Sequence, residues 1–95
     1  MNKYEAIFII KPELSEEEKK TLFTQIAEAI TKHGGEVSSA AVWSERRKFF
    51  FPIKKHLEGV YYLAAFNLPP LAVTDIRRVY SLNENILRVL ISKLE

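Results

Sequence analysis

The first β-rich segment of the chain, Lys3 to Lys11, is apolar on both of the faces that a strand would present. Successive side chains of a strand point to opposite sides of the sheet. The two sets are Tyr4, Ala6, Phe8 and Ile10 on one face, and Glu5, Ile7 and Ile9 on the other. Strands with two apolar faces are typical of the centre of a sheet. The sequence therefore predicts a sheet in which this segment is a central strand.

A helix is predicted directly after this strand. Pro12 ends the strand, and Ser15 followed three residues later by Glu18 forms the capping-box pattern that starts helices. Apolar side chains then recur at the spacing of one helix face, at Leu22, Phe23, Ile26, Ala27 and Ile30. Gly34 and Gly35 can supply the left-handed residue that a helix C-cap needs. The helix is therefore expected over about residues 16–33.

The remainder of the chain adds two β-rich segments, a second helix and a last strand. No turn signal interrupts residues 36–53, so one long or bent strand is expected there, and Gly59 is expected to close a hairpin into a strand over residues 60–68. Pro69 and Pro70 end that strand and suit the first turn of a helix. Its apolar stripe would be Val73, Ile76, Val79 and Tyr80. A turn over residues 83–85 leads to a strand over residues 86–94.

The order β-α-β-β-α-β has one natural arrangement. Right-handed crossovers place both helices on one face of a four-stranded antiparallel sheet, which is the α+β, ferredoxin-like fold. The first strand should lie beside the third, with the second and fourth strands at the edges. With 95 residues, 47% of them hydrophobic, the chain is expected to form a single domain over residues 1–95. The face without helices would expose Ile7 and Ile9, so it is a candidate partner surface.

The net charge of +2 is small, but the positive charge is concentrated in one stretch. Residues 44–55, "SERRKFFFPIKK", carry five Lys or Arg against one acid, whereas residues 1–43 carry five against seven and residues 56–95 four against four. Basic side chains attract phosphate, and aromatic rings stack on unpaired bases. The same pattern also fits an edge strand whose phenylalanines are core and whose charges prevent aggregation. The residues alone leave both interpretations open.

The sequence contains no constellation that is typical of an enzyme. Three glycines cannot form a phosphate-binding loop, no cysteine is available for a disulfide or a thiolate metal site, and His33 and His56 lack metal-ligand spacing. His33 is expected at the C-terminus of the first helix and His56 exposed in the hairpin. No catalytic residue, cofactor, metal or small-molecule substrate is therefore expected. No signal peptide or bilayer-spanning run is recognised, so a cytoplasmic protein without a membrane partner is expected.

Three segments carry a family pattern. They are "KYEAIFIIKPELSEE" at the start, "WSERRKFFFPIKKHLEGVYYLAAFNLPP" in the middle and "LNENILRVLISK" at the end. The Tyr-Glu start and the arginine pair followed by Pro-Ile-x-Lys are the specific parts. Together they resemble the bacterial small-subunit ribosomal protein S-six family over essentially the whole chain. One departure is Glu45, which stands where the family usually has glycine before the arginine pair.

The resemblance implies a structural, non-catalytic ribosomal protein that binds the central domain of small-subunit ribosomal RNA. It also implies a heterodimer with the ribosomal protein of the S-eighteen family, on the ribosome in the cytoplasm. By position in the family pattern, the residues expected to contact RNA are Lys3, Tyr4, Arg46, Arg47, Lys48, Lys54, Lys55, Arg88 and Lys93. The hairpin and the open sheet face would be shared with the protein partner.

Two other classes of protein use the same order of elements. A small regulatory module would bind a metabolite and dimerise through the open sheet face, but the glycine-bearing effector loop of such modules is absent. A small phosphatase would hold its anion in the loop after the first strand, which here is "KPELSEEE" and is acidic. Both are therefore kept as alternatives to a ribosomal protein, with the regulatory module preferred of the two.

Overall fold

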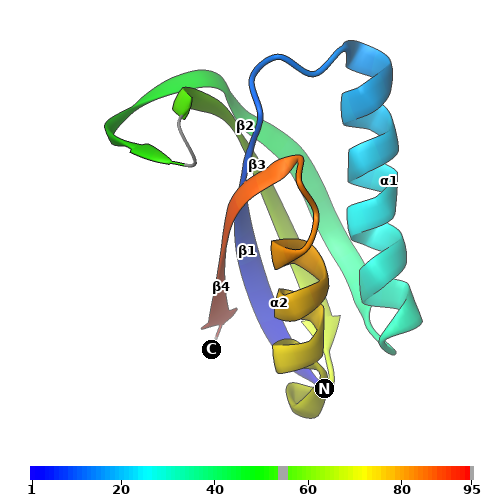
Figure 1. Cartoon of the computed structure of the whole chain (residues 1–95). Coiled ribbons are helices and arrows are strands. Elements are labelled where there is room, and N and C mark those ends of the chain that lie inside the picture. Colours follow the sequence, from blue (N-terminus) through cyan, green and yellow to red (C-terminus); the bar gives the residue numbers. More distant parts are fainter. Residues whose placement is uncertain (54–55, 95) are drawn as a thin grey trace.

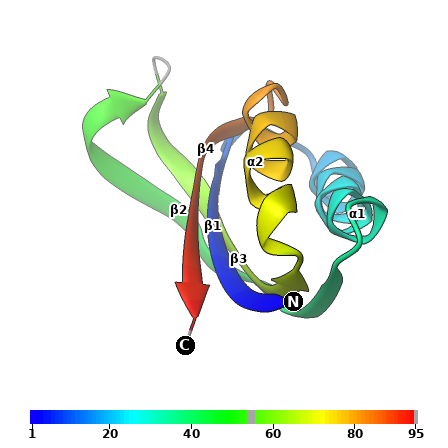
Figure 2. The ribbon, with the colours of Figure 1, turned by 90° about the horizontal axis from the view of Figure 1, so that it is seen from below.

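The computed structural model describes the backbone of residues 1–53 and 56–94, and the side chains of residues 1–43, 56 and 58–94. The elements follow one another as β1 (Asn2–Ile10), α1 (Glu16–Lys32), β2 (Glu36–Ile53), β3 (His56–Leu68), a 3₁₀ turn (Pro70–Ala72), α2 (Val73–Ser81) and β4 (Ile86–Leu94). All neighbouring strands pair antiparallel in one sheet of order β2-β3-β1-β4. Both helices lie on the same face of that sheet (Figures 1 and 2). The predicted ferredoxin-like fold is confirmed, with β1 central beside β3.

The hydrophobic core fills the space between the sheet and the helices. Alternate residues of β1 and β3 supply one side of it, as the period of two in these strands predicts. The buried sheet residues include Tyr4, Ala6, Phe8 and Ile10 of β1 and Tyr62, Ala64, Phe66 and Leu68 of β3. The helices contribute Leu22, Ile26, Ile30, Ile76 and Tyr80. The core joins α2 to the sheet through Phe8 and Tyr80, whose rings meet edge to face with centroids 4.8 Å apart.

Helix α1 begins at the predicted cap. The backbone N–H of Glu18 donates to Ser15 Oγ at 3.1 Å, and the backbone N–H of Ser15 donates to Glu18 Oε1 at 3.0 Å. The hydrogen bond from the backbone N–H of Ser15, and to a lesser degree the Ser15 side chain, favour the ionised carboxylate and so lower the pKa of Glu18. At the other end Gly34 takes the left-handed conformation with φ 85°, and the N–H of His33 Nδ1 donates to the carbonyl of Ala29 at 2.8 Å. Local sequence signals therefore fix both ends of this helix.

Replacing Ser15 by alanine is expected to lower the free energy of unfolding by about 1 kcal/mol, because the first turn loses its side-chain cap. Denaturant titration of the purified chain measures this change. Thr21→Ala, at an exposed position inside the same helix, is the matched control and should not lower stability, because alanine favours the helix more than threonine does. Equal losses in the two variants would show that the cap contributes nothing beyond helix propensity.

The β2–β3 hairpin is longer than the predicted one. The long strand expected over residues 36–53 is confirmed, but the turn expected at Gly59 is wrong: Gly59 lies inside β3, where it pairs with Arg47. Instead, Ile53 of β2 pairs with His56 of β3, and residues 54 and 55 between them are outside the described residues. Cross-strand pairing here outweighs the weak turn signal of a single glycine. Four register shifts interrupt the β2–β3 ladder, and such bulges bend strands, consistent with the curved end of the hairpin in Figure 1.

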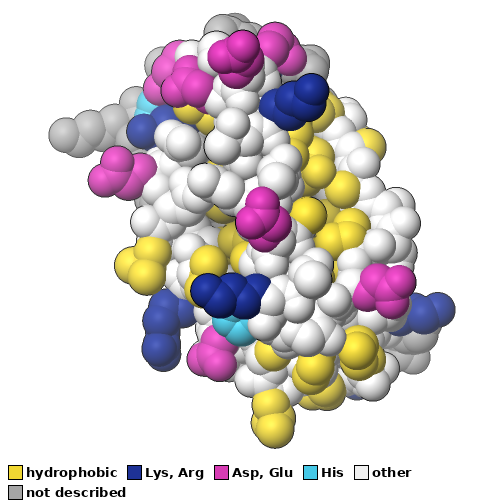
Figure 3. Space-filling view, turned by 90° about the vertical axis from the view of Figure 1, so that its right-hand side faces the viewer, with side chains coloured by type: hydrophobic (Ala, Val, Ile, Leu, Met, Phe, Trp, Pro, Cys, Tyr) yellow, Lys and Arg dark blue, Asp and Glu magenta, His cyan; other side chains and the backbone are white. Residues whose placement is uncertain are grey.

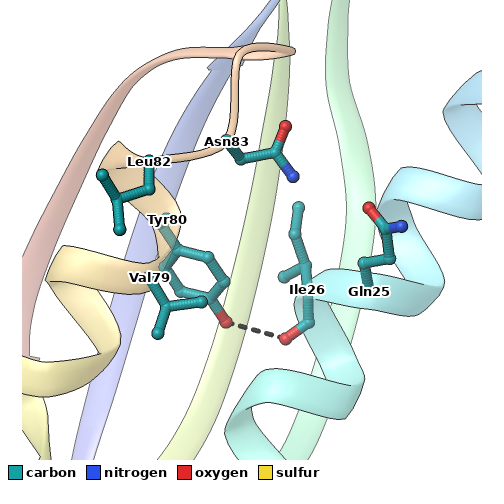
Figure 4. Close-up of a pocket in the computed structure, with 6 residues that line it drawn as sticks. All are labelled: Gln25, Ile26, Val79, Tyr80, Leu82 and Asn83. Atoms are coloured by element: carbon teal, nitrogen blue, oxygen red, sulfur yellow. Dashed lines mark hydrogen bonds between the residues drawn. The ribbon is translucent and has the colours of Figure 1, made fainter.

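The second helix is shorter than predicted and buries a narrower stripe. The proline pair is followed by the 3₁₀ turn, and α2 itself covers only Val73–Ser81. Ile76 and Tyr80 are buried as expected, but Val79 is 42% exposed, so its assignment to the core is wrong. Val79 is exposed because it lines a groove between α1 and α2 (Figure 4).

Candidate functional site

The sheet face opposite the helices has no covering element of its own among the described residues (Figure 2). Strand register arranges its side chains in rows that cross all four strands. The middle row is apolar and consists of Ala41, Leu63, Ile7 and Leu90. Ile7 is half-buried here, as expected, whereas Ile9 is only 5% exposed, so the prediction that it is exposed on this face is wrong. Leu87, at the start of β4, is likewise buried outside the helix-side core.

A shallow hollow of about 230 Å³ lies on this open face, over β2, β3 and β1. Its lining is Glu5, Ser39, Ala40, Ala41, Val42, Trp43, Leu63 and Ala65. Trp43 is 56% exposed and meets Tyr61 edge to face, with ring centroids 5.9 Å apart. Exposed tryptophan beside small apolar residues is the composition of a binding hot spot. Trp43 was absent from the residues predicted to bind.

Two of the predicted RNA-contacting residues, Lys3 and Arg88, lie exposed on the open face. Lys3 pairs with Asn67 and Leu94. Arg88 lies opposite Ile9, six residues along β1 from Lys3, which is about 20 Å at the rise of a strand. Lys93 is also exposed, but it pairs with Tyr4 and therefore lies on the helix side of β4, at the same end of the sheet as Lys3. The structure thus places Lys3 and Arg88 on either side of the apolar middle row and Lys93 on the opposite face.

Tyr4, in contrast, lies in the core. It points to the helix side of β1, is 6% exposed, and stacks on Phe66 with ring centroids 6.0 Å apart. Its hydroxyl accepts a hydrogen bond from Asn2 Nδ2 at 3.4 Å. The ring has no free face on which a base could stack. Burial thus makes Tyr4 a packing residue and argues against the RNA contact assigned to it from the family pattern.

The five remaining predicted residues belong to the basic end of the hairpin. The backbone of Arg46, Arg47 and Lys48 belongs to β2, while their side chains, and all of Lys54 and Lys55, lie outside the described residues. The backbone of β2 and β3 carries this end of the hairpin away from the helices, toward the open side of the sheet (Figures 1 and 2).

Nothing in the described part of the chain has the geometry of a catalytic or metal site. No group of three His, Cys, Asp or Glu side chains in it could hold a metal ion, and no helix in it is long and apolar enough to cross a membrane. His56 is partly covered rather than fully exposed, with Nδ1 3.8 Å from Glu13 Oε1. The contact between His56 and Glu13 joins the start of β3 to the loop after β1 and is structural rather than catalytic.

The groove between α1 and α2 is bounded by structural side chains. It has a volume of about 460 Å³ and is lined by Gln25, Ile26, Val79, Tyr80, Leu82 and Asn83. Figure 4 shows Tyr80 reaching from α2 to α1, where its hydroxyl donates to the carbonyl oxygen of Ile26 at 2.7 Å. Burial, and to a lesser degree the neighbouring Tyr62, raise the pKa of Tyr80 far above its ordinary value. A phenol held neutral in this way ties the helices together and is not an acid–base catalyst at neutral pH.

Comparison with known proteins identifies the family. The family model described as "Ribosomal protein S6" matches residues 3–93. The "Small ribosomal subunit protein bS6" of Dictyoglomus turgidum is 41% identical over 95 residues, which are all of this chain and 97% of that protein. The protein of the same name from Helicobacter pylori is 39% identical, and the chain spans 66% of its length.

A solved structure agrees with this assignment. The crystal structure of 30S ribosomal protein S6 from Thermotoga maritima superposes with a TM-score of 0.88 at 26% sequence identity, covering 98% of this chain and 87% of that one. Fold, length of match and sequence identity therefore lead to one family. The chain belongs to the ribosomal protein S6 family, whose members are structural proteins of the small ribosomal subunit and not enzymes.

Proposed function

We propose that this protein binds the central domain of small-subunit ribosomal RNA together with the ribosomal protein of the S-eighteen family, as a heterodimer on the ribosome in the cytoplasm. The observation that carries the RNA part is the location of the positive charge. Five of the fourteen Lys and Arg residues lie within residues 44–55, and the backbone of residues 44–53 forms the last part of β2, which curves away from the helices (Figure 1). A projecting basic arm can reach phosphates that a compact body cannot.

The exposed basic residues of the sheet add to this arm. Lys3 and Arg88, toward the two ends of the open face, and Lys93, on the helix side of β4, are exposed and available for phosphate contacts. Such contacts fix the register of a protein on a nucleic acid without reading its sequence. Recognition of RNA by this protein would then depend on shape and backbone contacts, with base stacking in a minor role.

The start of α1 is unsuited to binding RNA phosphates because it is acidic. Glu16, Glu17 and Glu18 form the first turn of α1, and Figure 3 shows acidic side chains gathered at that end of the helix side. Clustered carboxylates repel phosphate at the separations over which charges act in salt, about 10 Å. The RNA footprint is therefore expected on the hairpin and sheet edges, away from the start of α1.

Replacing Arg46, Arg47 and Lys48 together by alanine is expected to weaken binding of central-domain RNA about tenfold in the presence of the S-eighteen family protein. The slope of log affinity against log salt should flatten by about 0.9 for each phosphate contact removed. Filter binding over a range of salt concentrations measures both quantities with the full chain.

The matched control removes the same charge from the helix layer, by replacing Lys19, Lys20 and Lys32 of α1 with alanine. This variant should keep both the affinity and the salt slope of the wild type. Equal losses in the two triple variants would mean that only net charge matters, which contradicts a specific RNA-binding arm. Failure of the wild-type chain to co-sediment with small ribosomal subunits in the presence of its partner would contradict the proposed function as a whole.

A further inference from the structure

The groove between α1 and α2 continues into a second hollow toward the start of α1. The groove has Val79 and Leu82 in its lining. The second hollow has a volume of about 270 Å³, shares Gln25 with the groove, and is lined by Glu17 and Glu18 as well. Together the two hollows form one site, the helix groove, which is apolar at one end and acidic at the other.

The apolar end of the helix groove leaves large side chains uncovered. Leu82 is 76% exposed and Val79 is 42% exposed, and Figure 4 shows both on the α2 side, with Ile26 of α1 across from them. Single exposed apolar residues are normal on a protein surface, whereas here two of them border the same concave site. Such a site can bury a large apolar side chain of a partner.

Two side-chain amides line the helix groove beside its apolar end. Gln25 comes from α1 and Asn83 from the segment after α2 (Figure 4). Asn83 Oδ1 accepts a hydrogen bond from the backbone N–H of Asn85 at 2.9 Å. Within the described part of the chain, Asn83 Nδ2 and the side-chain amide of Gln25 make no hydrogen bond. These amides offer donors and an acceptor, which are the groups that pair with the backbone of an extended peptide.

The acidic end of the helix groove sets the charge of an occupant. Glu17 and Glu18 are exposed where they line the second hollow, and Glu84 is exposed in the turn next to Asn83. Figure 3 shows acidic side chains gathered at this end of the helix side. Among the described residues that line the two hollows, none is Lys or Arg. An acidic lining of this kind attracts basic side chains and repels the phosphates of RNA.

We propose that the helix groove docks an extended, basic protein segment, with a large apolar side chain between Ile26 and Leu82 and a Lys or Arg at Glu17 and Glu18. Ile26 and Glu18 are eight residues apart on α1, which is about 12 Å at the rise of a helix. An extended chain covers this distance in about four residues. The apolar and the basic residue of the segment are therefore expected about four positions apart. This site goes beyond the proposed function, which uses the hairpin and the sheet rather than the helix layer.

NMR titration of the full chain with short synthetic peptides tests the proposal. The peptides are rich in serine and carry one Leu and one Arg four positions apart, with one peptide for each order of the two residues. Backbone amide signals of the residues that line the helix groove should shift and saturate with at least one peptide, with a Kd of about 1 mM or tighter. The same peptide with Gln in place of Arg should bind about threefold more weakly.

The double variant Val79→Ala with Leu82→Ala removes the apolar end of the helix groove. It is expected to bind the peptide about tenfold more weakly, because buried apolar anchors carry much of the affinity of such sites. Its thermal unfolding should stay close to that of the wild type, because both side chains are largely exposed. Leu71→Ala is the matched control: Leu71 is 93% exposed and does not line the helix groove, so this variant should bind like the wild type.

The double variant Glu17→Gln with Glu18→Gln removes the acidic end. Glutamine at position 18 can still accept the N–H of Ser15, so the cap of α1 is kept. Peptide binding is expected to weaken about threefold and to lose its dependence on salt. Glu28→Gln with Glu36→Gln removes the same charge from exposed positions outside the helix groove and should bind like the wild type.

Each contrary result overturns the inference in a different way. Absence of shifts with both peptides would overturn it even if the same chain still co-sediments with small ribosomal subunits, which would leave the proposed function intact. Equal weakening by Leu71→Ala would reduce the binding to unspecific apolar association. Unchanged affinity of the Glu17→Gln, Glu18→Gln variant would contradict the basic occupant, and tighter binding of a single-stranded RNA oligonucleotide by this variant would assign the site to RNA. Shifts of the same signals with the concentration of the chain alone would assign it to a second copy.

Discussion

Replacing Gly35 by alanine is expected to lower the free energy of unfolding by about 3 kcal/mol, near the upper end for overpacking a tight site. A Cβ atom at this position would lie 2.5 Å from the carbonyl oxygen of Asn67, 2.8 Å from Leu68 Cδ1 and 2.9 Å from Ile30 Cγ2. All three distances are shorter than van der Waals contact. The nearest atom belongs to the backbone of β3, which cannot move without disturbing the pairing of Asn67 with Glu36.

The neighbouring Gly34 provides the matched control. A Cβ there would meet Pro69 Cγ at 3.6 Å, which is an ordinary contact, but its φ of 85° disfavours a side chain. Gly34→Ala should therefore cost only the conformational penalty, about 1 kcal/mol. Denaturant titration of both variants tests whether Gly35→Ala loses more stability than Gly34→Ala. A Gly34→Ala variant as unstable as Gly35→Ala would show that backbone conformation, and not the close approach of α1 to β3, requires the glycine pair.

Stability at alkaline pH is expected to fall steeply because of Tyr80. Burial raises the pKa of this phenol in the folded state, whereas in the unfolded chain it titrates near pH 10. Above pH 10 the unfolded state therefore loses a proton that the folded state keeps, so ionisation favours unfolding. The free energy of unfolding should fall by about 1.4 kcal/mol for each pH unit above 10, or about 3 kcal/mol by pH 12. Burial also raises the pKa of Tyr62, so its ionisation in the unfolded chain adds to the loss of stability at alkaline pH.

Tyr80→Phe separates this titration from the other effects of high pH. At neutral pH the variant should lose about 1 kcal/mol, because the hydrogen bond to the carbonyl of Ile26 is absent. Above pH 10 its stability should decline less steeply than that of the wild type, so the two curves converge. Denaturant titrations at several pH values between 8 and 12 measure the slopes. Parallel curves would mean that Tyr80 ionises equally easily in the folded and unfolded chain.

Membership of a ribosomal protein family also decides between the classes of protein that share this order of elements. The comparisons give no support to the metabolite-binding regulatory module, and the relatives reported above are ribosomal proteins. The phosphatase would be an enzyme, whereas the family is structural. The open sheet face that motivated the regulatory module is present in the described part of the chain.

Sequence reasoning succeeded where the signals are local. The capping box at Ser15, the glycine after α1 and the two-residue period of β1 each involve residues within a few positions of one another, and all three are confirmed. The strand order followed as well, because right-handed crossovers leave few arrangements for this order of elements. Errors arose where a local signal competed with tertiary pairing, as at Gly59, which continues β3 because β2 pairs alongside it.

The tertiary structure decided burial at positions where the sequence signals conflict or where two elements meet. The alternation of β1 predicts that Tyr4 shares a face with Ala6 and Phe8, and Tyr4 is buried in the core with them, which argues against the RNA contact inferred from the family pattern. Val79 has the spacing of a core residue but borders the gap between two helices, a gap that the sequence of neither helix specifies.

The sequence by itself determined the family, the fold and the basic stretch at residues 44–55, because each is encoded in residue order and periodicity. The residues that line the hollow at Trp43, Glu5 among them, are brought together only in the folded sheet. These residues come from β1, β2 and β3, which are brought side by side by hydrogen bonds between distant segments. A surface built across strands is a property of register, and register is set when the whole sheet packs against its helices.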